Sequence, residues 1–120
     1  MANMNLIYHL APAERWSSWP KDQLYFPIPY EQEGFIHCTR GDELMIKIAN
    51  RFYRDDPQDF VLLVLDTNKV EELGSPIKWE EATDMQELFP HIYGGIPQQA
   101  VVEVRKVQRA DDGTFVGWSS

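Results

Sequence analysis

The chain of 120 residues has a mass of 14.0 kDa, the size of one domain with one core, so we expect a single domain over residues 1–120. Its 11 basic and 19 acidic side chains give a formal net charge of −8, which argues against non-specific nucleic-acid binding because such binding depends on clustered Lys and Arg. The first five residues lack the features of a secretory signal. The longest apolar run, residues 60–65, is far shorter than the roughly 20 residues of a membrane span. We therefore expect no membrane association and a cytoplasmic location.

The first third of the chain predicts a strand, a short helix and a long loop. Residues 6–10 alternate as a strand, and Pro12 suits the first turn of a helix that runs through Trp16 and Trp19. Three prolines make residues 20–33 an irregular connection, longer than loops usually are. Long loops in compact domains often bind ligands, so this segment is a candidate lid.

Residues 34–39 predict a second strand that leads into a helix. Thr39 and Asp42 have the spacing of a capping box, with Asp in place of the usual Glu. The helix that follows carries apolar residues at helical spacing. Leu44, Ile48 and Phe52 form one stripe, with Met45 and Ala49 beside it.

The remaining elements are mostly strands. Residues 60–65 are apolar throughout, as expected of a strand covered on both faces. The other elements are a helical turn at 70–73 that ends at Gly74, a strand at 77–80, a turn-rich segment at 89–97, a strand at 101–105, and a hairpin at Asp112-Gly113. Strands outnumber helices, and this pattern indicates an α+β fold with a mixed or mostly antiparallel sheet.

The three histidines all have apolar neighbours. His9 shares a strand face with Ile7, because strand side chains alternate, and His37 lies in the second predicted strand. His91 lies between Pro90 and Ile92. A single histidine of this kind is more often a core residue bonded to backbone. Three of them favour one shared small-molecule cleft, although the sequence does not show that they meet.

A metal site and a cysteine nucleophile are the specific alternatives at these residues. A three-histidine site suits zinc, but the histidines lack the short spacings from which chelating pairs are commonly built, so we expect no metal. Cys38 is the single cysteine, which excludes a disulfide within the chain. Because adjacent strand residues point to opposite faces, Cys38 and His37 cannot form a catalytic pair, and we expect Cys38 to be a core residue.

Three further residues are weaker candidates. Glu80 lies at the end of a predicted strand, where it can bind hydroxyl groups or act as a general base. Tyr93 offers an aromatic face for a ligand ring, and a core role is equally compatible with the pattern. Thr39 shares the face of His37 and precedes a helix start, whose backbone N–H groups favour a phosphate. A glycine-rich phosphate loop is absent, since Gly94-Gly95 precedes a strand.

Several segments, in this order, resemble an uncharacterised bacterial family known as domain of unknown function 952. They are Ile7-Tyr8-His9-Leu10, Glu33-Gly34-Phe35-Ile36-His37-Cys38-Thr39, Ala49-Asn50-Arg51-Phe52-Tyr53, residues 61–66, Lys78-Trp79-Glu80 and Phe89-Pro90-His91-Ile92-Tyr93-Gly94. The resemblance covers nearly the whole chain.

That family is similar in fold to the ADP-ribosyltransferases, so the resemblance implies two small, mostly antiparallel sheets with short helices and a cleft for NAD. In those enzymes a histidine on the first core strand holds the NAD ribose, a role that His9 would match. In the RNA 2′-phosphotransferase branch a second histidine lies in a strand similar to the one that holds His37. Many transferases also carry a catalytic glutamate on a late strand, and Glu103 matches that pattern poorly.

The leading hypothesis is therefore a histidine-lined cleft that binds NAD, ADP-ribose or a related nucleotide. The binding candidates are His9, which the resemblance implies, and Thr39 and Tyr93, which their own positions suggest; His37, His91 and Glu80 are the catalytic candidates. The alternatives are a non-catalytic module that senses a ligand or binds a protein, and, third, a three-histidine metalloenzyme.

Overall fold

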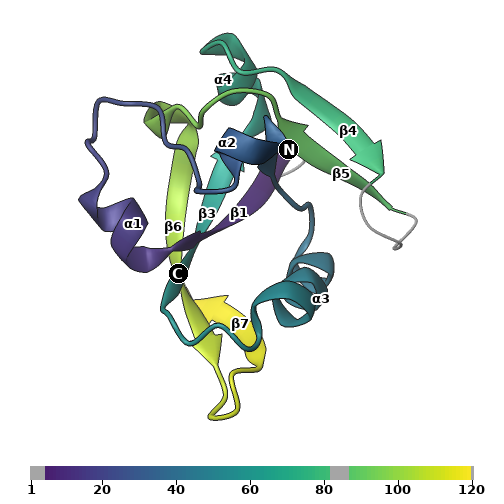
Figure 1. The fold of residues 1–120 in the computed structure, drawn as a ribbon. Coiled ribbons are helices and arrows are strands. Elements are labelled where there is room, and N and C mark those ends of the chain that lie inside the picture. Colours follow the sequence, from purple (N-terminus) through teal and green to yellow (C-terminus); the bar gives the residue numbers. More distant parts are fainter. Residues whose placement is uncertain (1–4, 82–86, 120) are drawn as a thin grey trace.

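The computed structural model describes residues 5–81 and 87–119. Its strands form two antiparallel sheets (Figure 1). The larger sheet has the order β1-β3-β6-β7, with the strands Leu6–Pro12, Phe60–Asp66, Val101–Arg109 and Phe115–Ser119. The smaller sheet has the order β2-β5-β4, with the strands Ile36–His37, Leu88–Ile92 and Ile77–Glu81. The helices are α1 (Ala13–Ser18), α2 (Tyr30–Glu33), α3 (Asp42–Tyr53) and α4 (Thr67–Glu72), and a 3-10 turn covers Gln98–Ala100. The expected α+β class is confirmed.

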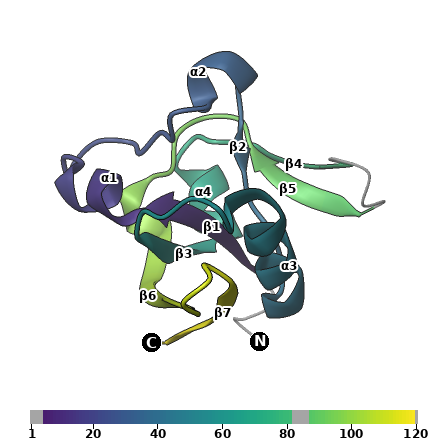
Figure 2. The ribbon, with the colours of Figure 1, turned by 60° about the horizontal axis from the view of Figure 1, so that its bottom comes forward.

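Strand β3 lies between β1 and β6 and is buried on both faces, as its apolar run predicts. On one face, Leu63 and Leu65 pack in a cluster with Ile36 and Ile92 of the smaller sheet. On the other face, Leu62 packs in a second cluster that contains residues of α3. Figure 2 shows β4, β5 and α3 arranged around β1 and β3. The two covers of β3 are thus different elements, a sheet and a helix.

Tyr25 anchors the long loop to the first cluster. Its side chain is fully buried, and the indoles of Trp16 and Trp19 lie edge-on to it, with ring centroids 5.3 and 5.1 Å away. Its backbone pairs with that of Ile96 through two hydrogen bonds of 2.9 Å. Edge-to-face aromatic pairs add stability beyond the area they bury. The loop is therefore fixed at its centre.

The expected irregular connection at 20–33 is wrong for its last residues, because Tyr30–Glu33 form α2. Gly34 ends this helix at φ 79°, in the left-handed region that glycine adopts without steric cost. Arg15 of α1 holds the loop from the other side, since its Nε and Nη2 donate to the carbonyl oxygen of Phe26 at 3.0 and 2.7 Å.

The start and the buried face of α3 differ from expectation. No side chain caps the helix at Gly41, so the expected capping box between Thr39 and Asp42 is wrong. The Asp42 carboxylate instead accepts a hydrogen bond of 2.7 Å from the Tyr8 hydroxyl. The buried residues are Met45 and Ala49, whereas Phe52 of the expected stripe is 51% exposed. The helix therefore turns its Met45 side, and not the expected Phe52 side, toward the large sheet.

The turn-rich assignment of residues 89–97 is also wrong for its first part, because residues 88–92 form β5, which lies between β2 and β4. Pro90 is tolerated in this central strand for a local reason. The N–H and C=O of a strand residue point to the same side, and the Pro90 carbonyl accepts from Cys38 N at 3.1 Å. The missing N–H of Pro90 therefore faces Cys38, just past the two-residue strand β2, and the ladder between β2 and β5 ends where this hydrogen bond is lost.

Within residues 5–81 and 87–119, no helix is long and apolar enough to cross a membrane.

The hairpin between β6 and β7 gives a first prediction. Gly113 has φ 92°, and a Cβ at this position would lie 2.4 Å from the carbonyl oxygen of Arg54. Gly113→Ala should lower the free energy of unfolding by about 2–4 kcal/mol, because left-handed strain adds to a clash with backbone. Gly34→Ala is the matched control, since Gly34 has φ 79° and open space around it, and should cost about 1 kcal/mol. Urea denaturation measures both, and equal losses would contradict the clash.

Candidate functional site

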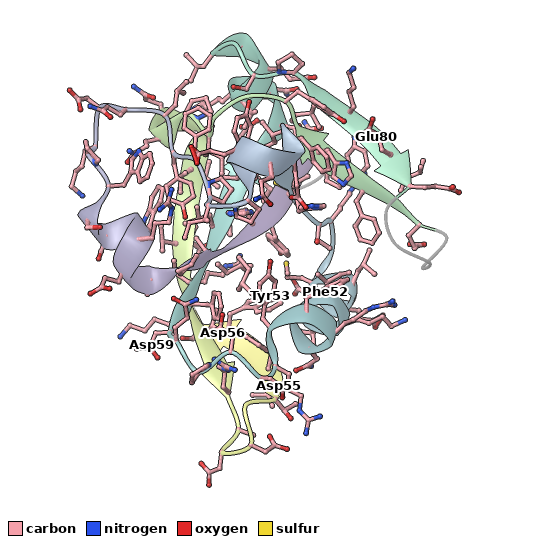
Figure 3. The ribbon with its side chains drawn as sticks, in the orientation of Figure 1. Phe52, Tyr53, Asp55, Asp56, Asp59 and Glu80 are labelled. Atoms are coloured by element: carbon pink, nitrogen blue, oxygen red, sulfur yellow. The ribbon has the colours of Figure 1, made fainter. Side chains whose placement is uncertain are left out.

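A cleft lies where the long loop, α2, β2 and α3 meet. It consists of a hollow of about 210 Å³ and a neighbouring hollow of about 480 Å³. The two share a wall of six residues, Pro29, Glu33, His37, Thr39, Ile48 and Tyr53. Phe52 and Tyr53, labelled in Figure 3, belong to the end of α3. Together the two hollows have the size of a small-molecule site.

His9 lies on the wall of the smaller hollow and is only 7% exposed. Its Nδ1 is 2.8 Å from the carbonyl oxygen of His37. A carbonyl oxygen only accepts, so Nδ1 carries the proton and donates. In the neutral ring Nε2 is therefore an acceptor, and this atom is buried with no bonding partner among the described residues. Burial lowers the pKa of His9 to about 4, which keeps the ring neutral at physiological pH.

His37 lines both hollows and is the accessible histidine of the cleft. Its side chain is 51% exposed, and its Nε2 lies 3.0 Å from Glu33 Oε1. The adjoining Thr39 is buried and lines both hollows as well. Backbone hydrogen bonds of 2.7 and 2.8 Å join Thr39 to Tyr8 of the larger sheet. The start of α3, however, lines a separate hollow with Asp42 and Glu43, so the helix N-terminus expected to hold a phosphate does not face this cleft.

His91 belongs to a second cluster beside the cleft. Its Nδ1 lies 2.9 Å from Glu80 Oε1, and the Tyr93 hydroxyl donates to the same oxygen at 2.6 Å. The Phe35 ring stacks on His91 with centroids 4.4 Å apart, and the His37 ring lies edge-on to His91 at 5.1 Å. Phe35 lines the smaller hollow, whereas neither His91 nor Glu80 is among the residues that line either hollow.

The candidate residues thus fall into two groups. His9, His37 and Thr39 surround the cleft, and Glu80, His91 and Tyr93 form a hydrogen-bonded cluster behind the Phe35 ring. Figure 3 shows Glu80 on β4, well away from Phe52 and Tyr53 of α3. His91 touches the cleft only through the rings of Phe35 and His37. The catalytic and binding roles of these residues stay predictions.

The hydrogen bonds within the second cluster shift two pKa values in opposite directions. The Tyr93 hydroxyl and then His91 stabilise the Glu80 carboxylate and lower its pKa. The same bond, with the carboxylate charge, raises the pKa of Tyr93. Lys78 Nζ also lies 4.8 Å from the centre of the Tyr93 ring. Tyr93 is therefore held by Glu80 and covered by Lys78, which leaves it a poor platform for a ligand ring.

The geometry also bears on the two alternative chemistries, a metal site and a cysteine nucleophile. No three His, Cys, Asp or Glu side chains of the described ranges are grouped as metal ligands. Cys38 is buried, and burial raises the pKa of its thiol. The thiol is thus protonated at neutral pH and unsuited to nucleophilic attack. Glu103, the poor match to a transferase glutamate, pairs with Arg105 at 3.1 Å.

Sequence reasoning missed several residues of the cleft. Phe35 and Tyr53 supply its aromatic walls, Met45 and Ile48 of α3 its apolar floor, and Arg15 a basic group. The contact of Glu33 with His37 had no signal either, because a spacing of four brings side chains together only within a helix, whereas α2 ends at Glu33 and His37 lies in β2. The others come from elements whose relative placement no local pattern encodes.

The buried state of His9 is testable through the pH dependence of stability. The folded chain binds a proton at His9 only near pH 4, whereas the unfolded chain binds it near pH 6.5. The free energy of unfolding therefore falls as the pH drops from 6.5 to 4, by about 3 kcal/mol from this residue. Urea denaturation at pH 7 and pH 4 should show that the free energy of unfolding of His9→Gln falls by about 3 kcal/mol less between these pH values than that of the wild type. The same pH dependence in both proteins would rule out a buried, neutral His9.

The Glu80 cluster predicts a change in the titration of Tyr93. Glu80→Gln removes the carboxylate charge that disfavours the phenolate, so the pKa of Tyr93 should fall toward 10. The ring-carbon chemical shift of Tyr93, followed by NMR between pH 8 and 12, measures this. Tyr53, whose hydroxyl lies outside the cluster, serves as the internal control. An unchanged Tyr93 curve would mean that the bond to Glu80 does not form in solution.

Comparison with known proteins gives matches to a family model and to solved structures. Residues 10–104 match the family described as protein of unknown function (DUF952). No curated protein matches. The chain is similar to the crystal structure of protein CC0527 from Caulobacter crescentus, with 28% identity, a TM-score of 0.73, and coverage of 92% of this chain and 93% of that chain.

The solution NMR structure of CC0527 matches with 25% identity and a TM-score of 0.70, over 92% of this chain and 90% of that chain. Neither structure is named as an ADP-ribosyltransferase, so that part of the expected fold stays a prediction. The family model covers most of the chain, and the expected family is confirmed. The chain belongs to the DUF952 family of proteins of unknown function.

Proposed function

We propose that this domain binds NAD, ADP-ribose or a related nucleotide in the cleft, through the nucleoside part of the ligand. In this proposal His9 binds a ribose hydroxyl, Thr39 lies beside it, and His37 faces the reacting end. The two antiparallel sheets with a cleft at their junction with α3 are compatible with the ADP-ribosyltransferase-like fold that we propose with it.

One observation carries the proposal, the buried Nε2 of His9. A buried acceptor without a partner costs free energy, and a ligand hydroxyl that donates to it would recover that cost. Because His9 Nδ1 donates to the His37 carbonyl, the ring cannot rotate to offer a proton instead. Since Nε2 is closed to solvent while His9 lines the smaller hollow, the proposal requires the adjoining side chains to move apart so that a ligand hydroxyl, such as one of ribose, can donate to this atom.

The aromatic walls of the cleft suit the base or the nicotinamide of such a ligand. Phe35 and Tyr53 both line the smaller hollow. They replace Tyr93, whose hydroxyl is bound to Glu80. Ring stacking on aromatic side chains is typical of base recognition.

A non-catalytic role is the second candidate, favoured by the position of the carboxylates. Many transferases place an acidic group at the reacting carbon, but here Glu80 is bonded to His91, on which the Phe35 ring stacks, and Glu103 is paired with Arg105. The same cleft would then serve a module that senses a ligand or presents it to a protein partner. Binding without turnover of NAD would favour this role.

The function is tested with His37→Ala. The side chain is half exposed and its hydrogen bond is to the partly exposed side chain of Glu33, so the variant should keep its melting temperature. Its affinity for NAD and ADP-ribose should fall at least tenfold, about 1.4 kcal/mol. Calorimetric titration measures the affinities, and Glu80→Gln is the control that alters only the second cluster. A lower melting temperature with unchanged affinity would make His37 a structural residue.

A further inference from the structure

The charges at the mouth of the cleft restrict which nucleosides it admits. Glu33 of α2 and Asp56, which follows α3, line the smaller hollow from opposite segments, and Tyr53 lies in the same wall. Both carboxylates raise the pKa of the Tyr53 hydroxyl, after the larger effect of burial. The two negative charges are thus close enough to act on one point inside the cleft.

Little positive charge balances them. Arg15 is the only Arg or Lys among the described residues that line the two hollows. Its Nε and Nη2 both donate to the Phe26 carbonyl oxygen, and its guanidinium lies over the Trp19 ring at 4.9 Å. These contacts hold Arg15 on the loop. A phosphate beside Glu33 and Asp56 would meet two carboxylates against the single guanidinium of Arg15 in the lining of the hollows, and like charges at such distances repel.

We infer that the cleft selects a positively charged, unphosphorylated nucleoside over its 5′-phosphate, with nicotinamide riboside as the chemical type. This inference rests on the proposed function and narrows its ligand class. The pyridinium ring carries the positive charge that Glu33 and Asp56 attract, and the walls of Phe35 and Tyr53 take the ring faces. The ribose hydroxyl donates to His9 Nε2. For NAD itself, the nicotinamide end enters and the diphosphate stays outside the mouth.

The experiment compares nicotinamide riboside with nicotinamide mononucleotide by calorimetric titration at low salt. The two share the cationic ring and the ribose and differ in the 5′-phosphate alone. We expect the riboside to bind at least tenfold more tightly, and its affinity to fall as the salt concentration rises, because salt screens exposed charges.

Two charge-removing variants locate the effect. Glu33→Gln keeps a hydrogen-bonding group beside His37 but removes one mouth charge, so it should reduce the preference for the riboside to threefold or less. Glu31→Gln is the matched control, because Glu31 lies on the same helix but is not among the residues that line either hollow. Equal effects of the two variants would assign the preference to net charge and overturn the inference. Melting temperatures of both variants confirm folding.

The outcomes separate this inference from the function on which it rests. Tighter binding of the mononucleotide or of NAD than of the riboside would overturn the selection and leave the proposed function in place. Failure of the riboside, the mononucleotide, NAD and ADP-ribose alike would overturn both.

Discussion

Strand β3 needs a cover on both faces, and the rest of the structure follows from this requirement. Its side chains from Leu62 to Leu65 are buried, and each is worth about 1.5–3 kcal/mol when fully removed from water. The smaller sheet covers one face and α3 the other. Only four residues, 38–41, separate the end of β2 from the start of α3. The two covers therefore diverge from a common edge of the large sheet, and the cleft lies between them.

The same edge links the fold to the site. Thr39 is bonded to the backbone of Tyr8, and His9 donates to the carbonyl of His37, so two neighbouring contacts join β1 to the segment between β2 and α3. The second contact also determines which nitrogen of His9 carries the proton. A change that loosens the junction of the sheets therefore also changes the hydrogen-bonding character of the cleft. In the proposed function, His9 would thus couple stability to ligand binding.

Phe35 divides the polar residues of this region into two sets with different properties. On the cleft side, His37 and Glu33 are partly exposed and can exchange partners with a ligand. Behind the ring, His91 is buried and Glu80 already accepts two hydrogen bonds. The bond from the Glu80 carboxylate orients the buried ring of His91 and joins β4 to β5 in the small sheet. The two clusters meet where the His91 ring contacts the rings of His37 and Phe35.

The sequence by itself determined the elements with strong local patterns. The apolar run of β3, the alternation of β1 and β6, the helix after Thr39 and the hairpin at Gly113 all follow from residues close in the chain. It also determined that Cys38 faces away from His37 and that His9 shares a strand face with Ile7, because strand side chains alternate. Tertiary structure decided the rest. Met45 rather than Phe52 faces the core because it packs in one cluster with Leu62 of the large sheet. Pro90 lies in a strand because β5 pairs with β4 along its whole length. His91 is bonded to Glu80 and is not among the residues that line the cleft. Each of these outcomes depends on contacts between separate elements of the chain, and the free energy of such contacts is absent from any local pattern.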